Sequence, residues 1–553
     1  MRMMPTEFLK IKDRHGTPTR SKRKPTSHVA HMSAPLKGLS RLAALNEADP
    51  LLASILTNFV VEQDRISLRP GYFRMGAIAD GRPISTLIPF YGSTPTFVAA
   101  AGDGLYNASG TRIGTHSYGS DVWSWTSFAN LSQTKYTVMV NGIDGIIAWD
   151  GTTTSLPVMD LAGHPDDFKG LPEVDPNGFQ YLNIDTRALP PGFNAAKLDK
   201  VLAHQNRLWF ANSTDLAVYY LPLQVLSGTF GILPLNAYFR RGGAIRAIMT
   251  WTYTGGSGMD SLLVIFSTNG EAAIYQGADP DAVDGSFKLV GIYRFDTPMG
   301  PGCTVNYGGE LYVLIGTGLV PMSTLLKAEE DNLGISDQNI MQEFSDVSKT
   351  FRDSYGWSII VNSQTNHAIC NLPIGSGKYE QLVRFMPNPI WSKWTNIPSR
   401  CWAWLDNHAY FGTENGRICR GGREYLNDDG AAIDIDVRFA WSSFKSVAKK
   451  QFKMIRLYMM SDSIPQPFVD VEVDYETIVP TNKPDAAAVN TAALWDTATW
   501  DVDGWAVDAV PRQKWQGVVG LGRVGAPRIR ASFKGSTFAL TGADVIYEEG
   551  GLM

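Results

Sequence analysis

The sequence predicts a mainly β protein: a β-propeller of about six blades, an additional C-terminal β-domain and an extended N-terminal arm. The chain has 553 residues, more than one ordinary core supports. It is rich in glycine (53), proline (31) and tryptophan (15), and only 19% of its residues are charged, which is typical of turn-rich folds rather than long helices. After residue 65, short apolar runs alternate with turn residues.

Six of these runs predict β-hairpins, because each holds an apolar strand, a turn with Gly, Asn, Thr or Asp, and a second strand. The first is "TFVAAAGDGLYNASG", and the six begin at Thr96, Tyr136, Arg207, Ser261, Glu310 and His408. One small sheet cannot bury both of its faces, whereas sheets stacked around an axis can. Hairpins about 40–60 residues apart favour propeller blades, but their spacing is too ragged to fix the number of blades. We expect six blades, give or take one, with a series of β-sandwiches as the alternative fold.

Composition divides the chain into four parts. Residues 1–35 are a basic N-terminal arm, broken by proline and glycine, that we expect to be flexible or ordered only by a neighbour. Residues 36–75 are a linking segment with a short helix, which Pro50 interrupts. Residues 76–429 form the propeller platform. Residues 430–553 form a separate β-domain, or strands that return to close the propeller.

The charge is unevenly distributed. The net charge is -5, but the first 50 residues hold ten Lys/Arg and four Asp/Glu, so the remainder carries -11. An acidic body argues against a general nucleic-acid binder and fits self-assembly or a surface that repels nucleic acid. There is no membrane-spanning apolar run and no secretory signal, and the four cysteines form no CxxC pair, so we expect synthesis in a reducing cytoplasm.

No catalytic, cofactor or metal site is predicted. The eight histidines lack zinc spacing, and the "ADPDAVDG" turn has Val283 where a calcium ligand should stand. The sequence contains no GxSxG elbow and no GxxxxGK[ST] phosphate loop. Gly520, Gly522 and Gly525 match GxGxxG formally, but the sequence continues as a strand, so a turn is the better interpretation.

The segment "WDTATWDVDGW" holds the candidate site residues Trp495, Trp500 and Trp505. In a strand, the first and third would share one face and the second would point to the other. Aromatic residues on both faces favour burial on both faces, by the chain itself or by a neighbouring subunit. We therefore predict structural packing or a subunit contact, and keep a glycan site as the third hypothesis.

Several segments, in this order, carry a resemblance to a known family: "LYNASG", "MVNGIDGIIAWDGTT", "NRLWFANSTDLAVYYLPLQVLSGT", "FRRGGAI", "TNGEAAIYQGADPD", "RFDTPMGPGCTVNYGGELYVLIGTGLVPMS", "LWDTATWDVDGW" and "KWQGVVGLGRVGAPRIRAS". Together the chain resembles the tail nozzle (tail hub, tail tubular protein B) of short-tailed bacteriophages over residues 32–553. The basic arm before residue 32 departs from the family's pattern.

The resemblance implies a structural virion protein and no enzyme. Six copies would form a homo-oligomeric ring in the virion tail, below the portal-adaptor ring, after synthesis in the host cytoplasm. The ring would carry tail fibres or spikes, gate genome ejection, and let genomic DNA pass without sequence-specific binding. The family offers no catalytic residues to carry over. The alternative function is a β-propeller protein that binds or cleaves glycans.

Overall fold

A computed structural model of the chain describes residues 27–41, 49–114, 116–151, 184–185, 189, 193–226, 228–254, 259–327, 338–477 and 509–550. The protein is mainly β and is built from many small sheets, as the sequence predicts. The division of the chain at residues 35, 75 and 429 stays a prediction.

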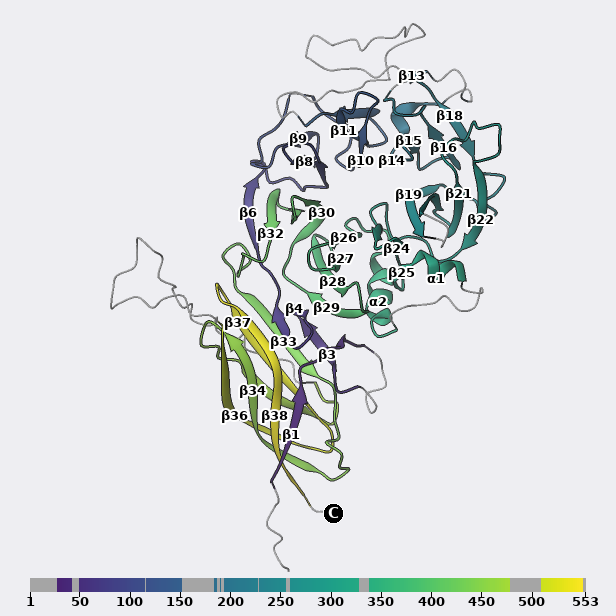
Figure 1. The fold of residues 1–553 in the computed structure, drawn as a ribbon. Coiled ribbons are helices and arrows are strands. Elements are labelled where there is room, and N and C mark those ends of the chain that lie inside the picture. Colours follow the sequence, from purple (N-terminus) through teal and green to yellow (C-terminus); the bar gives the residue numbers. More distant parts are fainter. Residues whose placement is uncertain are drawn as a thin grey trace, which may run out of the picture.

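Within the described residues, seven small groups of antiparallel strands follow one another in a ring (Figure 1). The first three are β7 (Thr86–Phe90), β8 (Thr96–Ala101) and β9 (Gly104–Tyr106); β10 (Ser124–Ala129), β11 (Lys135–Val140) and β12 (Ile146–Trp149); and β14 (Lys200–His204), β15 (Arg207–Ala211), β16 (Ala217–Tyr220) and β18 (Gly231–Pro234).

The next four sheets complete the ring. They are β19 (Ile245–Thr254), β20 (Met259–Ser267), β21 (Glu271–Gln276) and β22 (Lys288–Arg294); β23 (Thr304–Tyr307), β24 (Glu310–Ile315) and β25 (Gly318–Pro321); β26 (Ser358–Asn362), β27 (His367–Gly375), β28 (Lys378–Phe385) and β29 (Ile390–Trp394); and β30 (Ser399–Leu405), β31 (His408–Thr413), β32 (Arg417–Gly421) and β6 (Tyr72–Ala77). A short parallel pair, β13 (Ile184–Asp185) and β17 (Gly228–Thr229), lies outside these sheets.

Packing on two neighbouring sheets explains why central ring strands such as β8 and β15 are largely apolar. Successive side chains of a strand point to opposite faces of its sheet. In β15, Leu208 and Phe210 pack toward the preceding sheet, whereas Trp209 and Ala211 pack toward the following one. Each of the seven sheets packs on its two neighbours through buried apolar side chains. Six of these contacts form clusters of their own, and the contact between the β23–β25 and β26–β29 sheets belongs to a larger cluster that extends beyond the ring. The central strands of the sheets are therefore largely buried on both faces.

The two ends of the ring segment meet in one sheet. Strand β6, at the start of the segment, pairs antiparallel with β32 at its end, with Tyr72 opposite Gly421 and Ala77 opposite Arg417. On the other side of this sheet, β30 lies against β7. The ring is thus closed by hydrogen bonds between segments some 340 positions apart in the chain.

Two neighbouring ring sheets use the same turn. Asn141 follows β11 and Asn212 follows β15, and each side-chain oxygen accepts the backbone N–H groups two and three residues on. The amide group of each asparagine then donates to the aspartate at the third position, Asp144 or Asp215. This repeated Asx turn accounts for the hairpin signal that the sequence shows at both places.

Two larger sheets form a β-sandwich beside the ring. One has the order β36 (Val510–Gly522), β34 (Lys450–Ser461), β38 (Phe538–Glu549), β5 (Ile66–Leu68) and β4 (Phe59–Val61), with β1 (Ser27–Ser33) paired to β38. The other extends the ring sheet that ends in β29 through β3 (Leu52–Thr57), β33 (Ile433–Phe439), β37 (Gly525–Phe533) and β35 (Phe468–Val473), with β2 (Gly38–Leu39) on β3. Their inner faces share one core, which includes Leu457, Val545, Val437 and Ile529.

The short helix expected in residues 36–75 is absent from the described part of that segment. Strands β2 to β6 occupy it instead, and residues 42–48 lie outside the described part. Tertiary pairing outweighs local preference here, because β3 is held between β33 and β2. The helical elements that the structure describes are α1 (Met322–Lys327), α2 (Met341–Phe351) and the 3-10 turn η1 (Ala195–Lys197). Neither α-helix is long and apolar enough to cross a bilayer.

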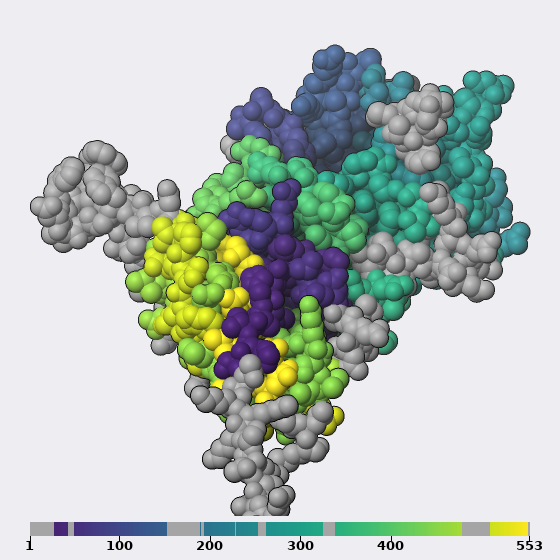
Figure 2. All heavy atoms as spheres, turned by 60° about the horizontal axis from the view of Figure 1, so that its bottom comes forward, coloured from purple at the N-terminus to yellow at the C-terminus, as the bar shows by residue number. Residues whose placement is uncertain are grey.

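The end of the N-terminal arm is part of the sandwich. Strand β1 pairs with β38 from Ser27 opposite Glu548 to Ser33 opposite Gly542, and Met32 is buried. In Figure 2 the purple N-terminal strands lie among the yellow C-terminal ones. The expectation that all of residues 1–35 form a flexible arm is therefore wrong for residues 27–33, which a partner strand in the same chain orders; residues 1–26 lie outside the described part.

Removing β1 should lower stability even in the isolated chain. We expect a chain that begins at residue 34 to lose about 2 kcal/mol or more of unfolding free energy relative to one that begins at residue 27, because Met32 leaves the core and the edge of β38 is exposed. Chemical unfolding of the two truncated chains measures the difference. Equal stabilities would contradict this role for β1.

Candidate functional site at the junction of ring and sandwich

The candidate site residues Trp495, Trp500 and Trp505 lie outside the described residues. Their segment joins β35 to β36 in the sandwich, between Thr477 and Ala509. Their assignment to packing or to a subunit contact stays a prediction. The best-defined constellation of polar side chains lies elsewhere, where the chain passes between sandwich and ring.

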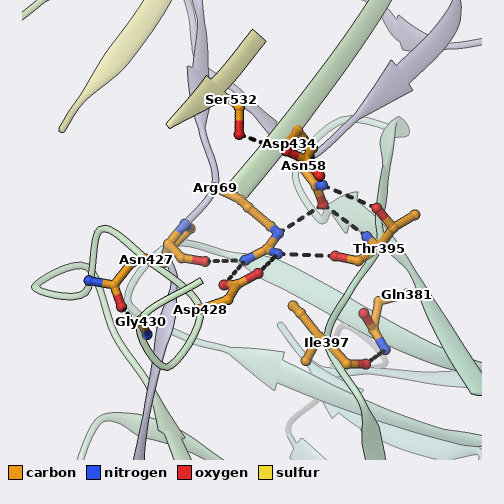
Figure 3. Close-up of polar contacts among 11 residues, drawn as sticks. Asn58, Arg69, Gln381, Thr395, Ile397, Asn427, Asp428, Gly430, Asp434 and Ser532 are labelled. Atoms are coloured by element: carbon orange, nitrogen blue, oxygen red, sulfur yellow. Dashed lines mark hydrogen bonds and ion pairs between the residues drawn. The ribbon is translucent and has the colours of Figure 1, made fainter. Parts of the chain in front are cut away.

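Arg69 is the centre of this junction (Figure 3). It lies on the segment that leads from β5 of the sandwich into β6 of the ring, and its side chain is fully buried. Its guanidinium donates to Asp428 through two parallel hydrogen bonds of 2.9 and 2.6 Å. Asp428 lies on the segment that leads from β32 back to β33. One ion pair therefore joins the two segments by which the chain enters and leaves the ring.

Asn58 links this ion pair to Thr395, on the segment that leads from β29 to β30. Its Oδ1 accepts from Arg69 Nε and from the backbone N–H of Thr395, both at 2.8 Å. Its Nδ2 donates to Thr395 Oγ1 at 3.1 Å and to the backbone carbonyl of Asp434 at 2.6 Å. Arg69 also donates to the carbonyls of Pro70 and Thr395. All five N–H donors of the guanidinium are thus used, and the buried charge is fully hydrogen-bonded.

Backbone geometry makes the junction possible. Asn58 has a φ of 63°, which asparagine tolerates better than most residues, and this turns the chain from β3 into β4. A Cβ at Gly71 would lie 2.1 Å from the carbonyl oxygen of Asn427, so only glycine fits where the two crossing segments touch. Gly71 also donates its N–H to the carbonyl of Tyr425 at 2.7 Å.

A pocket of about 470 Å³ lies beside this network. Its walls come from three sources: the closing ring sheet, the neighbouring ring sheet that ends in β29, and the β4–β5 end of the sandwich. The aromatic side chains that line it include Tyr72, Trp394, Trp402, Trp404 and Phe411. Tyr72 and Trp402 each contact the Phe411 ring, with centroids 5.0 Å apart.

Titratable groups in the pocket wall respond to burial. Burial lowers the pKa of His367 to about 4, so this side chain is neutral near pH 7. Burial also raises the pKa of the Tyr72 hydroxyl, which therefore keeps its proton. Burial opposes ionisation of Glu424, but its backbone hydrogen bond and Arg420 outweigh that effect and lower its pKa. The wall thus presents neutral aromatic groups and, at Glu424, a charge that Arg420 compensates.

Catalytic geometry is not evident in the described residues. No group of three or more potential metal ligands comes together in that part of the chain. The nearest approach to a nucleophile and base is Ser213, whose Oγ lies 2.8 Å from Lys200 Nζ. However, the Ser213 hydroxyl donates to Asp199, and Lys200 is paired with the same carboxylate, so the lysine does not activate the serine. The hydrogen bonds at the junction hold the two chain segments together.

Sequence reasoning did not single out Arg69 or Asp428. The local signal is weak, because "LRPG" and "LNDDG" are ordinary turn sequences. The two residues are 359 positions apart in the chain, and only the closed ring brings them together.

No protein-family model and no curated protein matches the chain. Among solved structures, it is similar to the Myceliophteria thermophila Cps50 (Swd1) β-propeller domain. The identity is 12%, the match covers 63% of this chain and 99% of that one, and the TM-score is 0.37. A likeness at this TM-score carries no argument about function.

Replacing Arg69 with methionine should destabilise the protein by about 3–5 kcal/mol, because Asp428 stays buried without its cation. Guanidinium unfolding measures the loss. The double variant Arg69→Met/Asp428→Leu should recover part of it, since both charges are then removed. As a control, Asp64→Asn breaks an exposed ion pair with Arg65 and should leave stability unchanged. A loss no larger than the control's would show that the junction does not depend on this pair.

Stability should fall as the pH falls through the range in which His367 titrates. The unfolded chain takes up this proton near pH 6.5, whereas the folded chain does so only near 4. The stabilising contribution is therefore complete above about pH 6.5 and is lost toward pH 4. We expect His367→Gln to weaken the fall in melting temperature between about pH 7 and pH 5. An unchanged pH profile would contradict the assignment.

Proposed function

We propose that this protein is the tail nozzle of a short-tailed phage. In this role, copies of the chain form a ring around the DNA exit channel below the portal-adaptor ring. The ring anchors fibres or spikes and gates genome ejection. We propose further that the seven ring sheets are blades of a β-propeller platform, a number within the expected range of about six. The sandwich is the additional C-terminal β-domain.

The observation that carries the proposal is where the family-like segments lie. "MVNGIDGIIAWDGTT" contains the β11–β12 turn, "NRLWFANSTDLAVYYLPLQVLSGT" contains β15 and β16, and "TNGEAAIYQGADPD" contains β21. "KWQGVVGLGRVGAPRIRAS" covers most of β36 and β37, consecutive strands that lie in the two different sheets of the sandwich. The resemblance is therefore spread over both parts of the molecule, which supports a shared architecture rather than one shared motif.

The physical character of the molecule supports a structural role. The body of the chain is acidic, so a channel lined by it would repel passing DNA phosphates. The junction joins ring and sandwich through a buried, fully hydrogen-bonded ion pair, which suits a permanent part of a larger assembly. Glycan cleavage, the enzymatic form of the alternative function, has no specific observation in its favour.

The proposal predicts that the chain is incorporated into tails. In cells infected by a phage that lacks the gene, the wild-type chain supplied in trans should restore tailed, infectious particles and be found in them by mass spectrometry. Trp500→Ala should fold with an unchanged melting temperature but be incorporated poorly, as expected of a subunit contact. Particles that gain infectivity without containing the chain would refute the proposal.

Trp391→Ala is the matched control for a folding defect. This side chain is 1% exposed and packs against Phe344 of α2. The Trp391→Ala substitution should lower the melting temperature strongly. If Trp500→Ala instead behaves like Trp391→Ala, the tryptophan segment is a packing element and not a contact between subunits.

A further inference from the structure

We propose that the junction pocket binds a neutral oligosaccharide. This goes beyond the structural role proposed above, because it adds a ligand site to the face where ring and sandwich meet. The pocket of about 470 Å³ has the size of sites that hold small ligands. Its occupant is inferred from the side chains that line it.

The closing ring sheet presents an aromatic platform to the pocket. Along β30, residues alternate between buried and half-buried, and Trp402 and Trp404 are half-buried residues on the same face. Their Cα atoms are two strand positions apart, about 7 Å. Trp402 is held in place by its contact with the Phe411 ring. Two adjacent indoles at this spacing offer apolar surface to two consecutive sugar rings.

The opposite wall of the pocket is also aromatic. Trp394, from the neighbouring ring sheet, also lines the pocket, and its indole N–H donates to the carbonyl of Phe59 at 3.0 Å. This hydrogen bond fixes the ring before any ligand arrives. His367, two strands away in the same sheet, also lines the pocket; it is neutral near pH 7, and its ring is tilted against that of Phe385, with centroids 5.3 Å apart. A ligand between these walls meets aromatic surface on two sides, which preorganises the site.

Most charged side chains that line the pocket are paired with a neighbouring charge. Arg65 is paired with Asp64 at 2.9 Å and with Glu62 at 3.5 Å, so its charge is compensated. Glu424 accepts from Arg420 at 2.9 Å. Arg69, at the base, is paired with Asp428 as described above. Of the charged side chains that line the pocket, Arg423 has no ion pair within the described residues, whereas the others already have partners and can share them with uncharged hydroxyl groups.

Three amide side chains also line the pocket, those of Asn362, Gln364 and Asn407. An amide offers both donors and an acceptor, which matches the hydroxyl groups of a sugar. The Asn362 side chain is fixed, because its oxygen accepts the backbone N–H groups of Gln364 and Thr365. Aromatic faces combined with neutral amides fit a saccharide better than a purely apolar ligand.

The test uses the full-length protein and four defined probes: maltotriose, cellotriose, mannotriose and N,N′,N″-triacetylchitotriose. Saturation-transfer NMR and calorimetric titration report binding. We expect at least one probe to bind with a Kd below about 1 mM. The Trp404→Ala variant should bind that probe at least about tenfold more weakly. Trp515→Ala removes an exposed indole from the sandwich and should bind like the wild type.

If Trp404→Ala fails to fold, Gln364→Ala replaces it, because that side chain is exposed on a turn. It should weaken binding at least about threefold while the melting temperature stays unchanged. No binding of any probe at about 10 mM would overturn the proposal, as would equal affinity in the wild type and the pocket variants. Since the readout is binding, failure here is distinct from failure to enter phage particles.

Discussion

The Arg69–Asp428 ion pair is the interaction on which the arrangement of ring and sandwich depends. The chain passes from sandwich to ring through residues 68–72 and returns through residues 421–433, and the pair joins the two passages. A buried ion pair contributes little net stability compared with apolar residues of similar size, because both charges lose their hydration. The ion pair does fix the geometry of the junction. Two guanidinium donors bind the two oxygens of Asp428, and the other three bind Asn58, Pro70 and Thr395, so the two segments are held in one relative placement.

The ring itself depends on a different constraint, the packing of every sheet against both of its neighbours. Each sheet contributes alternate side chains to two hydrophobic clusters, so removing any one sheet would expose two of them. The junction pocket lies where this pattern is incomplete. There the closing sheet and its neighbour share Phe411, Trp394 and Cys419 in their cluster, but the wall also meets the strands of the sandwich. These three surfaces leave a space between them, and aromatic side chains line it.

Local sequence signals predicted the hairpins and little beyond them. The runs beginning at Thr96, Tyr136 and Arg207 do form adjacent antiparallel strands, because their turns carry the required residues. The pairing of β6 with β32 and of β1 with β38 has no local signature, since the partners lie hundreds of residues apart. The same distance hid the junction site. Apolar spacing alone does not separate a short helix from buried strands, and the described part of residues 36–75 forms strands where a short helix was expected.

Closure of the ring by its first and last strands has a consequence for synthesis. Strand β6 leaves the ribosome about 340 residues before β32, and at typical translation rates this is roughly 20–70 s. During that time its edge has no partner, and the same holds for β1 until β38 is made. Exposed strand edges promote pairing with other chains. The nascent chain therefore has to keep its beginning unpaired, or guarded by a chaperone, until its end is complete.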